Sequence, residues 1–141
     1  MSKESRSGSM LIAVIILALL VTAATYLFFE RKGGFSVGDQ VYGEWTTKVW
    51  YPGKINKTCE KGFNILYNDG DEKCLSKEEL ITDAAPENNV IKIGSKVIAQ
   101  YMSGPFYEAT VVGVQGDRCQ VAYAFDKQVA TKNLSEVRLT K

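Results

Sequence analysis

The stretch VWYPGKI, Val49–Ile55, decides the fold because a closely related stretch occurs fifty-six residues later. In GPFYEATV, Phe106 matches Trp50 and Val111 matches Ile55. Alternate residues of a strand face the same side, so an aromatic pair, a small residue and a β-branched residue in this order indicate a bent strand with one buried face. The sequence therefore predicts two copies of one short β unit.

The rest of the chain after the glycine pair at residues 33–34 follows the same repeat. FSVGDQVYGEW aligns with IKIGSKVIAQY, FNILYNDGD aligns with CQVAYAFDK, and CLSKEELI aligns with TKNLSEVRL after a small slip. No ten-residue stretch shows helical periodicity. A unit of about fifty residues with four or five strands protects its edges only by curling into a barrel. We therefore expect an all-β protein with two tandem small barrels.

Single positions carry part of this prediction. Gly53 and Ala109 stand where a bent strand needs a small side chain, and Ile55 and Val111 are expected to point into the two barrels. The aromatic residues Tyr51, Tyr107 and Phe63 are expected to belong mainly to the cores. The tetrapeptide NDGD, residues 68–71, is a strong hairpin turn signal.

The first thirty residues are a separate object. Met10–Phe29 is an apolar run without a charge, and as a helix it would span about 30 Å, the thickness of the bilayer hydrocarbon. The run ends abruptly at Glu30-Arg31-Lys32. It predicts a single transmembrane helix, with membrane lipid as its partner.

A cleavable signal peptide is the alternative interpretation of this segment. The small residues Val21-Thr22-Ala23 resemble a cleavage site, but the apolar run continues to Phe29 without a polar region. Lys3 and Arg6 precede the run and two basic residues follow it, so the positive-inside rule favours neither orientation clearly. We expect a membrane-anchored, single-pass protein with a slight preference for its N-terminus inside.

The predicted organisation has six parts. They are a polar tail at 1–9, the transmembrane helix at 10–29, a hinge at 30–34, the first barrel at 35–83, a linker at 84–90 and the second barrel at 91–141.

Composition excludes several classes of function. The chain has no histidine, which removes histidine-based catalysis and the commonest zinc ligand. The three cysteines show no C-x-x-C spacing, although Cys59 and Cys74 could pair in an oxidising compartment. The net charge is +1, so nucleic acid is not an expected partner. We expect no enzyme activity, no metal and no cofactor.

The motifs G-D-x-V-x-G-x-W, W-Y-P-G-K-I, I-L-Y-N-D-G-D-E and L-S-x-E-E-L carry a family resemblance. The chain resembles Tudor domains of the tandem-Tudor and agenet type, which are SH3-like five-stranded barrels. The resemblance covers Phe35 to about Asp83 and, more loosely, Ile91–Leu139. It implies rings at each barrel mouth that enclose a methylated lysine or arginine through cation–π attraction. A departure is Asp71, where some methyl-lysine readers have a further aromatic residue.

The resemblance places the site candidates residue by residue. In the first barrel they are Trp45, Trp50, Tyr67 and Asp69, and in the second they are Tyr101, Phe106, Tyr123 and Phe125. Small barrels also cover their ends with aromatic rings simply to exclude water, so a structural role stands beside the binding role.

Two functions remain open at this point. Phe35–Asp83 carries a net charge of −3 and the region 89–141 a net charge of +3, which suits either a cationic ligand on the first barrel or packing between the barrels. The first function is a non-enzymatic, membrane-anchored interaction module that binds a protein partner or peptide. The second is an accessory or assembly subunit of a larger membrane complex, with the barrels packed on partner subunits.

Overall fold

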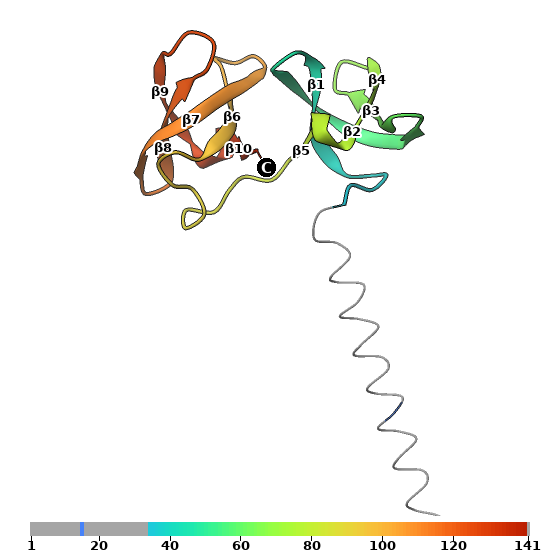
Figure 1. Cartoon of the computed structure of the whole chain (residues 1–141), viewed down its shortest axis with the longest axis horizontal. Helices are drawn as coiled ribbons and strands as arrows, with labels where there is room; N and C mark the ends of the chain where they lie inside the picture. Colours follow the sequence, from blue (N-terminus) through green and yellow to red (C-terminus); the bar gives the residue numbers. More distant parts are fainter. Residues whose placement is uncertain (1–14, 16–33, 141) are drawn as a thin grey trace, which may run out of the picture. The chain divides into compact units, whose positions relative to one another are not determined.

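The computed structural model describes residues 34–140 and, before them, Ile15 alone. Over residues 34–140 the chain forms ten strands and two short 3₁₀ turns, which confirms the all-β prediction for this part (Figure 1). Ser36–Lys141 form one compact unit. The first barrel contains β1 (Gln40–Thr46), β2 (Val49–Cys59), β3 (Gly62–Tyr67), β4 (Glu72–Leu75), η1 (Lys77–Glu79) and β5 (Leu80–Thr82). The second contains β6 (Lys96–Gln100), β7 (Phe106–Gln115), β8 (Arg118–Tyr123), β9 (Val129–Asn133), η2 (Leu134–Glu136) and β10 (Val137–Leu139).

The predicted membrane segment, Met10–Phe29, lies outside the described residues except for Ile15. The polar tail and most of the hinge lie outside them as well. In the described part of the chain, no helix has the length and apolar character that crossing a bilayer requires. The anchor and its orientation therefore stay predictions.

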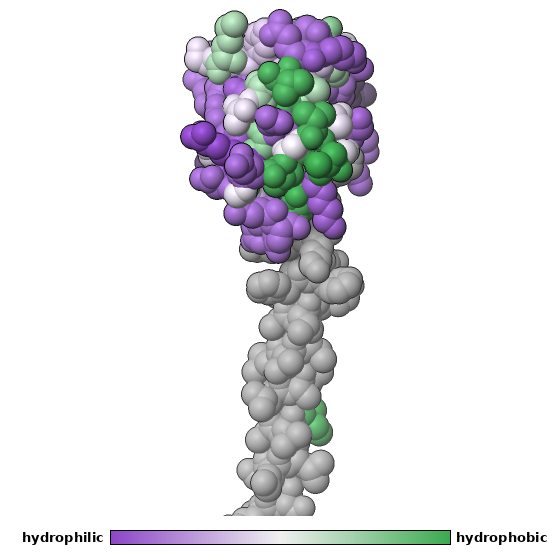
Figure 2. All heavy atoms as spheres, turned by 90° about the vertical axis from the view of Figure 1, so that its left-hand side faces the viewer, coloured by the Kyte–Doolittle hydropathy of each residue, from purple (hydrophilic) through white to green (hydrophobic). Residues whose placement is uncertain are grey.

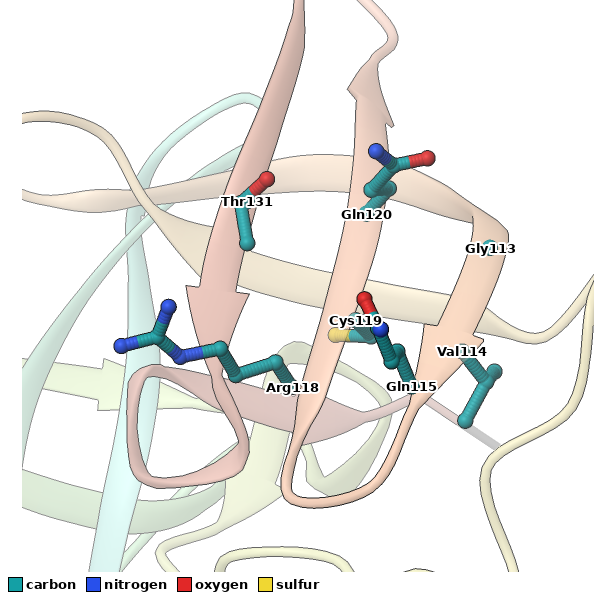
Figure 3. Close-up of a pocket in the computed structure, with 7 residues that line it drawn as sticks. All are labelled: Gly113, Val114, Gln115, Arg118, Cys119, Gln120 and Thr131. Atoms are coloured by element: carbon teal, nitrogen blue, oxygen red, sulfur yellow. The ribbon is translucent and has the colours of Figure 1, made fainter.

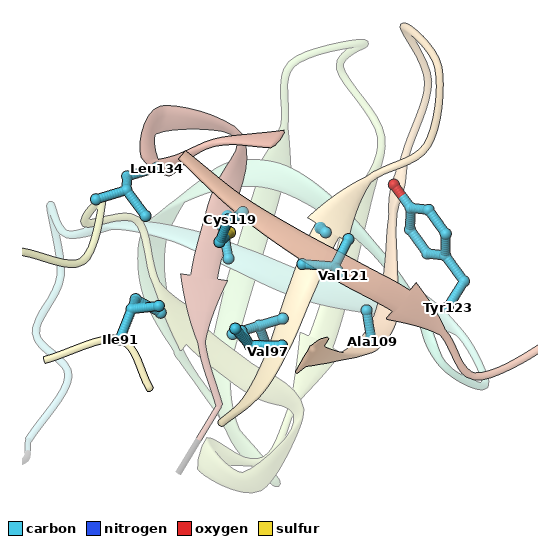
Figure 4. Close-up of a cluster of buried hydrophobic side chains, with 10 residues drawn as sticks. Ile91, Val97, Ala109, Cys119, Val121, Tyr123 and Leu134 are labelled. Carbon is cyan, nitrogen blue, oxygen red and sulfur yellow. The ribbon is translucent and has the colours of Figure 1, made fainter. Parts of the chain in front are cut away.

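Buried and exposed residues alternate along the long strands β2 and β7, and the buried ones build the two cores. In β2, Gly53 and Ile55 are buried and Lys54 between them is exposed. In β7, Ala109 and Val111 are buried in the same way, so the inward direction predicted for these positions is confirmed. The second core gathers around Ala109 and Val111 from β6, β7, β8, η2 and β10 and from Ile91 before β6 (Figure 4). Its members are Ile91, Val97, Ala99, Ala109, Val111, Cys119, Val121, Tyr123, Leu134 and Val137.

Gly53 has a steric reason to be a glycine. A Cβ at this position would lie 2.8 Å from Ile65 Cγ2 and 2.8 Å from the backbone oxygen of Leu66. The neighbouring strand β3 thus approaches β2 too closely for a side chain. The strong bend predicted for this stretch follows from that approach.

The prediction that Tyr51 belongs to the core is wrong, because 38% of this residue is exposed. Its cross-strand partner in β1 is Gly43, which has no side chain to cover the ring. Phe63 and Tyr107, predicted together with it, are partly buried.

The two barrels meet through their counterpart strands, β2 and β7. These pair antiparallel, with Trp50 opposite Phe106, so that one continuous sheet runs through both barrels. Trp50, Phe106, Tyr42 and Ile98 form a buried cluster at this junction. The Arg138 guanidinium lies 5.3 Å from the Tyr42 ring centroid and donates to the Asp83 carboxylate across the same junction.

Both barrels close in the same manner after their fourth strand. The Glu79 carboxylate accepts a hydrogen bond from the Ser76 backbone N–H at 2.9 Å, and Glu136 accepts one from Asn133 at 2.9 Å. Each bond satisfies an N–H at the start of a 3₁₀ turn that would otherwise lack a partner there. The motifs CLSKEELI and TKNLSEVRL, which align only after a small slip, therefore both form a 3₁₀ turn capped by a glutamate.

A disulfide joins Cys59 at the end of β2 to Cys74 in β4, with the Cα atoms 6.0 Å apart. It crosses β3, which pairs with both strands. Cys119 is a free, buried thiol in the second barrel. The pairing left open in the sequence is thus present in the structure.

Reduction of this disulfide should destabilise the protein. The cysteines are 15 residues apart, for which closure of the loop in the unfolded chain predicts about 3 kcal/mol. Urea unfolding with and without a reductant measures the difference. A Cys59→Ser/Cys74→Ser variant is the control, because it should not respond to the reductant. Alkylation of all three cysteines in denatured, unreduced protein would contradict the pairing.

Candidate functional site

Four aromatic rings converge at one end of the second barrel. Tyr101 follows β6, Tyr107 lies in β7, Tyr123 ends β8, and Phe125 lies in the loop before β9. The Phe125 ring centroid lies 4.9 Å from that of Tyr107, 5.2 Å from Tyr101 and 5.7 Å from Tyr123. Tyr101 also contacts Tyr107 at 5.9 Å and Tyr123 at 5.1 Å, both edge to face. We call these four residues the Tyr101 cluster.

Exposure in the Tyr101 cluster is graded. Tyr123 is 2% exposed, Tyr101 and Tyr107 are partly buried, and Phe125 is 54% exposed. Figure 4 shows Tyr123 at one end of the core, away from Leu134 at the other. The cluster therefore continues the core outward and ends in one solvent-exposed ring.

Different hydrogen bonds hold the buried residue of the cluster, Tyr123, and the loop that carries the exposed residue, Phe125. The Tyr123 hydroxyl donates to the backbone oxygen of Gln100 at 2.5 Å, which ties β8 to β6. Burial raises the pKa of Tyr123 to about 12, with Glu136 as the next cause, so the phenol stays neutral at physiological pH. The Phe125 loop is held by local bonds, among them Lys127 N–H to the Tyr123 oxygen.

A groove opens beside the cluster between the two barrels. Its volume is about 440 Å³, and its walls are Thr47, Lys48, Val49, Tyr107, Glu108, Ala124 and Phe125. Lys48 Nζ lies 3.4 Å from a Glu108 carboxylate oxygen, and both side chains are well exposed. Such a pair is weak in water, so another cation can replace Lys48 at little cost. The groove thus offers two rings and one carboxylate.

The first barrel has a smaller aromatic site. The Trp45 ring contacts the buried Tyr67 ring edge to face at 5.2 Å. Asp69 is exposed, and its carboxylate accepts the Asp71 backbone N–H within the β3–β4 turn. Burial raises the pKa of Tyr67, and the nearby carboxylates, Asp69 among them, raise it further. Lys73 already lies over Trp45, with Nζ 5.9 Å from the ring centroid.

The structure divides the eight predicted site residues into three groups. Trp45, Tyr67 and Asp69 lie at one end of the first barrel, and Tyr101, Tyr123 and Phe125 lie in the Tyr101 cluster. Trp50 and Phe106 belong to the buried junction between the barrels. Of the two roles that the sequence left open for aromatic rings, packing and binding, these two residues therefore have the packing role.

The sequence prediction missed Tyr107, which contacts both Tyr101 and Phe125. The signal was present, because Tyr107 shares its strand face with Ala109 and Val111, whereas Phe106 faces the other way. The aromatic pair of the second repeat therefore serves two surfaces, with Phe106 at the junction and Tyr107 at the barrel end.

A second hollow of about 280 Å³ lies at the other end of β8 (Figure 3). Its lining runs from Gly113 and Val114 to Arg118 and Thr131, and it contains no aromatic ring. Among the residues that the structure describes, no group of three His, Cys, Asp or Glu side chains is placed to hold a metal ion.

Apolar side chains gather on one side of the second barrel (Figure 2). The exposed large apolar residues of this barrel and of the segment that leads into it are Val90, Ile93, Met102, Val112, Val114, Phe125 and Val129. Apolar surface of this kind is typical of an interaction site.

Comparison with solved structures places this fold among known ones. The AGD34 structure of AGDP1 from Arabidopsis thaliana matches 76% of this chain and 83% of its own, with a TM-score of 0.52 and 18% identity. The tandem Agenet domain 3-4 of ADCP1 matches 76% of this chain and 81% of its own, with a TM-score of 0.51 and 18% identity. The fold is Tudor-like.

Comparison with sequences adds little to this Tudor-like assignment. No family model matches the chain. An alanine–tRNA ligase from Buchnera aphidicola is 30% identical over 113 residues, which is 74% of this chain. The matched segment is only 12% of that ligase's length.

Alkaline pH should unfold the Tudor-like unit through its buried tyrosines, Tyr42, Tyr67 and Tyr123, because burial raises the pKa of each. A raised folded-state pKa means that the neutral phenol is favoured in the folded state, whereas the unfolded chain ionises near pH 10. The free energy of unfolding should therefore fall as the pH rises from about 10 to about 12. Tyr123, whose pKa is raised from 10.0 to about 12, should account for up to roughly 3 kcal/mol of this fall.

Urea unfolding between pH 8 and pH 12 checks this. Tyr123→Phe should flatten the decline relative to the wild type. Tyr51→Phe removes an exposed hydroxyl and should leave the decline unchanged. Equal slopes for all three proteins would contradict the expectation.

Proposed function

We propose that this chain is a non-enzymatic recognition module that binds a peptide bearing a cationic side chain, a methylated lysine above all, at the Tyr101 cluster. The observation that carries the proposal is the convergence of four rings on one barrel end, with Phe125 more than half exposed. Ring faces attract a cation through their quadrupoles, and they bury its methyl groups without needing a hydrogen-bond donor.

The groove beside the cluster supports a peptide rather than a free small molecule. It continues from Phe125 and Tyr107 to the β1–β2 turn of the first barrel, so a ligand there contacts both barrels. Glu108 lies in its wall and supplies a negative charge close to the rings. A cationic side chain that displaces Lys48 would gain this carboxylate and the aromatic faces together.

Peptide binding should depend on Phe125. A panel of short peptides with one central lysine carrying zero to three methyl groups, titrated by calorimetry, measures it. Phe125→Ala should weaken binding of the methylated peptides by roughly 2- to 30-fold, because one ring contact contributes about 0.5–2 kcal/mol. Ile93→Ala, which removes an even more exposed apolar side chain of the same barrel, should leave binding unchanged. Failure of the wild type to bind any peptide would refute the proposal.

A membrane tether is the second part of the proposal. It rests on the uncharged run Met10–Phe29, and the disulfide of the first barrel agrees with a position on the oxidising side of the membrane. With the N-terminus inside, the barrels would face that side. Peptides or proteins of that compartment would then be the partners.

Carbonate extraction of membranes tests the tether. Intact protein should stay in the membrane pellet, and a variant with Leu19→Arg and Leu20→Arg should be released, because charges at the centre of the span oppose insertion. Release of the intact wild-type protein would refute the tether, and a mature N-terminus near Ala24 would show a cleaved signal peptide instead.

An accessory subunit of a membrane complex is the second candidate function. The apolar side of the second barrel favours it, because such a surface can pack on a partner subunit (Figure 2). A stoichiometric partner retained through native purification, together with no peptide binding, would favour this candidate over the recognition module.

A further inference from the structure

The first barrel holds an ammonium group of its own at its aromatic site. Lys73 Nζ donates to the backbone oxygens of Glu44 at 2.9 Å and Trp45 at 2.5 Å. The same ammonium lies 5.9 Å from the centroid of the Trp45 ring, within the range of cation–π attraction. Two carbonyls and one ring therefore surround a cation that the chain itself supplies.

The second barrel lacks this arrangement at the corresponding position. Ile65 pairs with Lys73, and its counterpart Val121 pairs with Ala130, so Ala130 takes the place of Lys73. The alanine side chain carries no charge and is too short to reach the aromatic rings at the barrel end. No lysine of β9 can therefore enter the Tyr101 cluster from this position.

Carbonyl groups at equivalent positions of the two barrels also accept hydrogen bonds from different donors. In the second barrel the Tyr123 hydroxyl donates to the Gln100 oxygen. In the first barrel the corresponding Glu44 oxygen accepts from Lys73, and the buried Tyr67 hydroxyl has no hydrogen-bond partner among the described residues. The lysine has thus taken the acceptor that the tyrosine uses in the other copy.

We propose that the Trp45 end of the first barrel is a binding site for a primary ammonium group and that Lys73 is its resident ligand. A primary ammonium has three N–H donors, so it satisfies both carbonyls while it faces the ring. A quaternary ammonium has none, and it would leave both carbonyls without a donor. The first barrel is therefore selective for unmethylated amines and is closed to external cations in the wild type.

This inference is independent of peptide binding by the second barrel. It also changes the meaning of the net negative charge of the first barrel, which the sequence linked to an external cationic ligand. The cation at the Trp45 ring is a lysine of the same barrel, so this ring needs no external one. External cations are left to the Tyr101 cluster.

Chemical rescue of Lys73→Ala in the full chain tests the inference. The substitution should lower the melting midpoint by roughly 4–8 °C, as loss of about 1 kcal/mol does in a unit of this size. Methylammonium chloride should restore most of the loss, and tetramethylammonium chloride at equal ionic strength should not. Both tryptophans lie in the first barrel, so their emission should respond to methylammonium in this variant.

Two further variants keep the test decisive. Lys57→Ala is the matched control, because it removes an exposed first-barrel lysine that pairs with Glu72, and neither cation should affect it beyond the wild type. Lys73→Arg keeps the donors and should melt near the wild type, whereas Lys73→Met keeps the chain length without donors and should melt lower. A Lys73→Met protein as stable as the wild type, or equal rescue by both cations, would overturn the proposal.

Discussion

The structure depends on the antiparallel pairing of β2 with β7 at Trp50 and Phe106. These residues are counterparts in the repeat, so the pairing relates the two barrels by an approximate two-fold rotation. Their rings pack with Tyr42 and Ile98, which are also counterparts, in the only apolar cluster described at the junction between the barrels within residues 34–140. Two small barrels with thin cores thereby share one continuous sheet and bury aromatic surface that neither could bury alone.

Two ion pairs also connect the barrels. Arg138 of the second barrel bonds to Asp83 of the first and lies over the Tyr42 ring. Lys48 of the first barrel reaches Glu108 of the second on the other side. The two ion pairs run in opposite directions, so together they contribute nothing to the opposite net charges seen in the sequence, and only Arg138–Asp83 has the signs of those net charges. The more buried of the two pairs, Arg138–Asp83, is the better stabiliser, because solvent screens it less.

Duplication has left two barrel ends with different chemistry. One holds four rings with an exposed Phe125, and the other holds Trp45 and Tyr67 with a lysine already in place. One of the differences lies in the fourth strand, where the first barrel has Lys73 and the second has Ala130. Residues of the β1–β2 turn of the first barrel nevertheless form one wall of the groove beside the Tyr101 cluster.

Local pattern was enough to predict much of this architecture. The repeat, the NDGD turn and the inward positions Ile55 and Val111 all follow from strand alternation and turn chemistry, which act between near neighbours in the chain. The resemblance to Tudor domains, rather than the local pattern, named six of the residues that lie at the two barrel ends. Tertiary structure decided the rest, because Trp50 and Tyr51 are equally aromatic and face opposite sides of one strand. Only the pairing with β7 shows which side is covered. The contact of Lys73 with Trp45 likewise joins residues on different strands, and no spacing in the sequence predicts where a long, flexible side chain will place its charge.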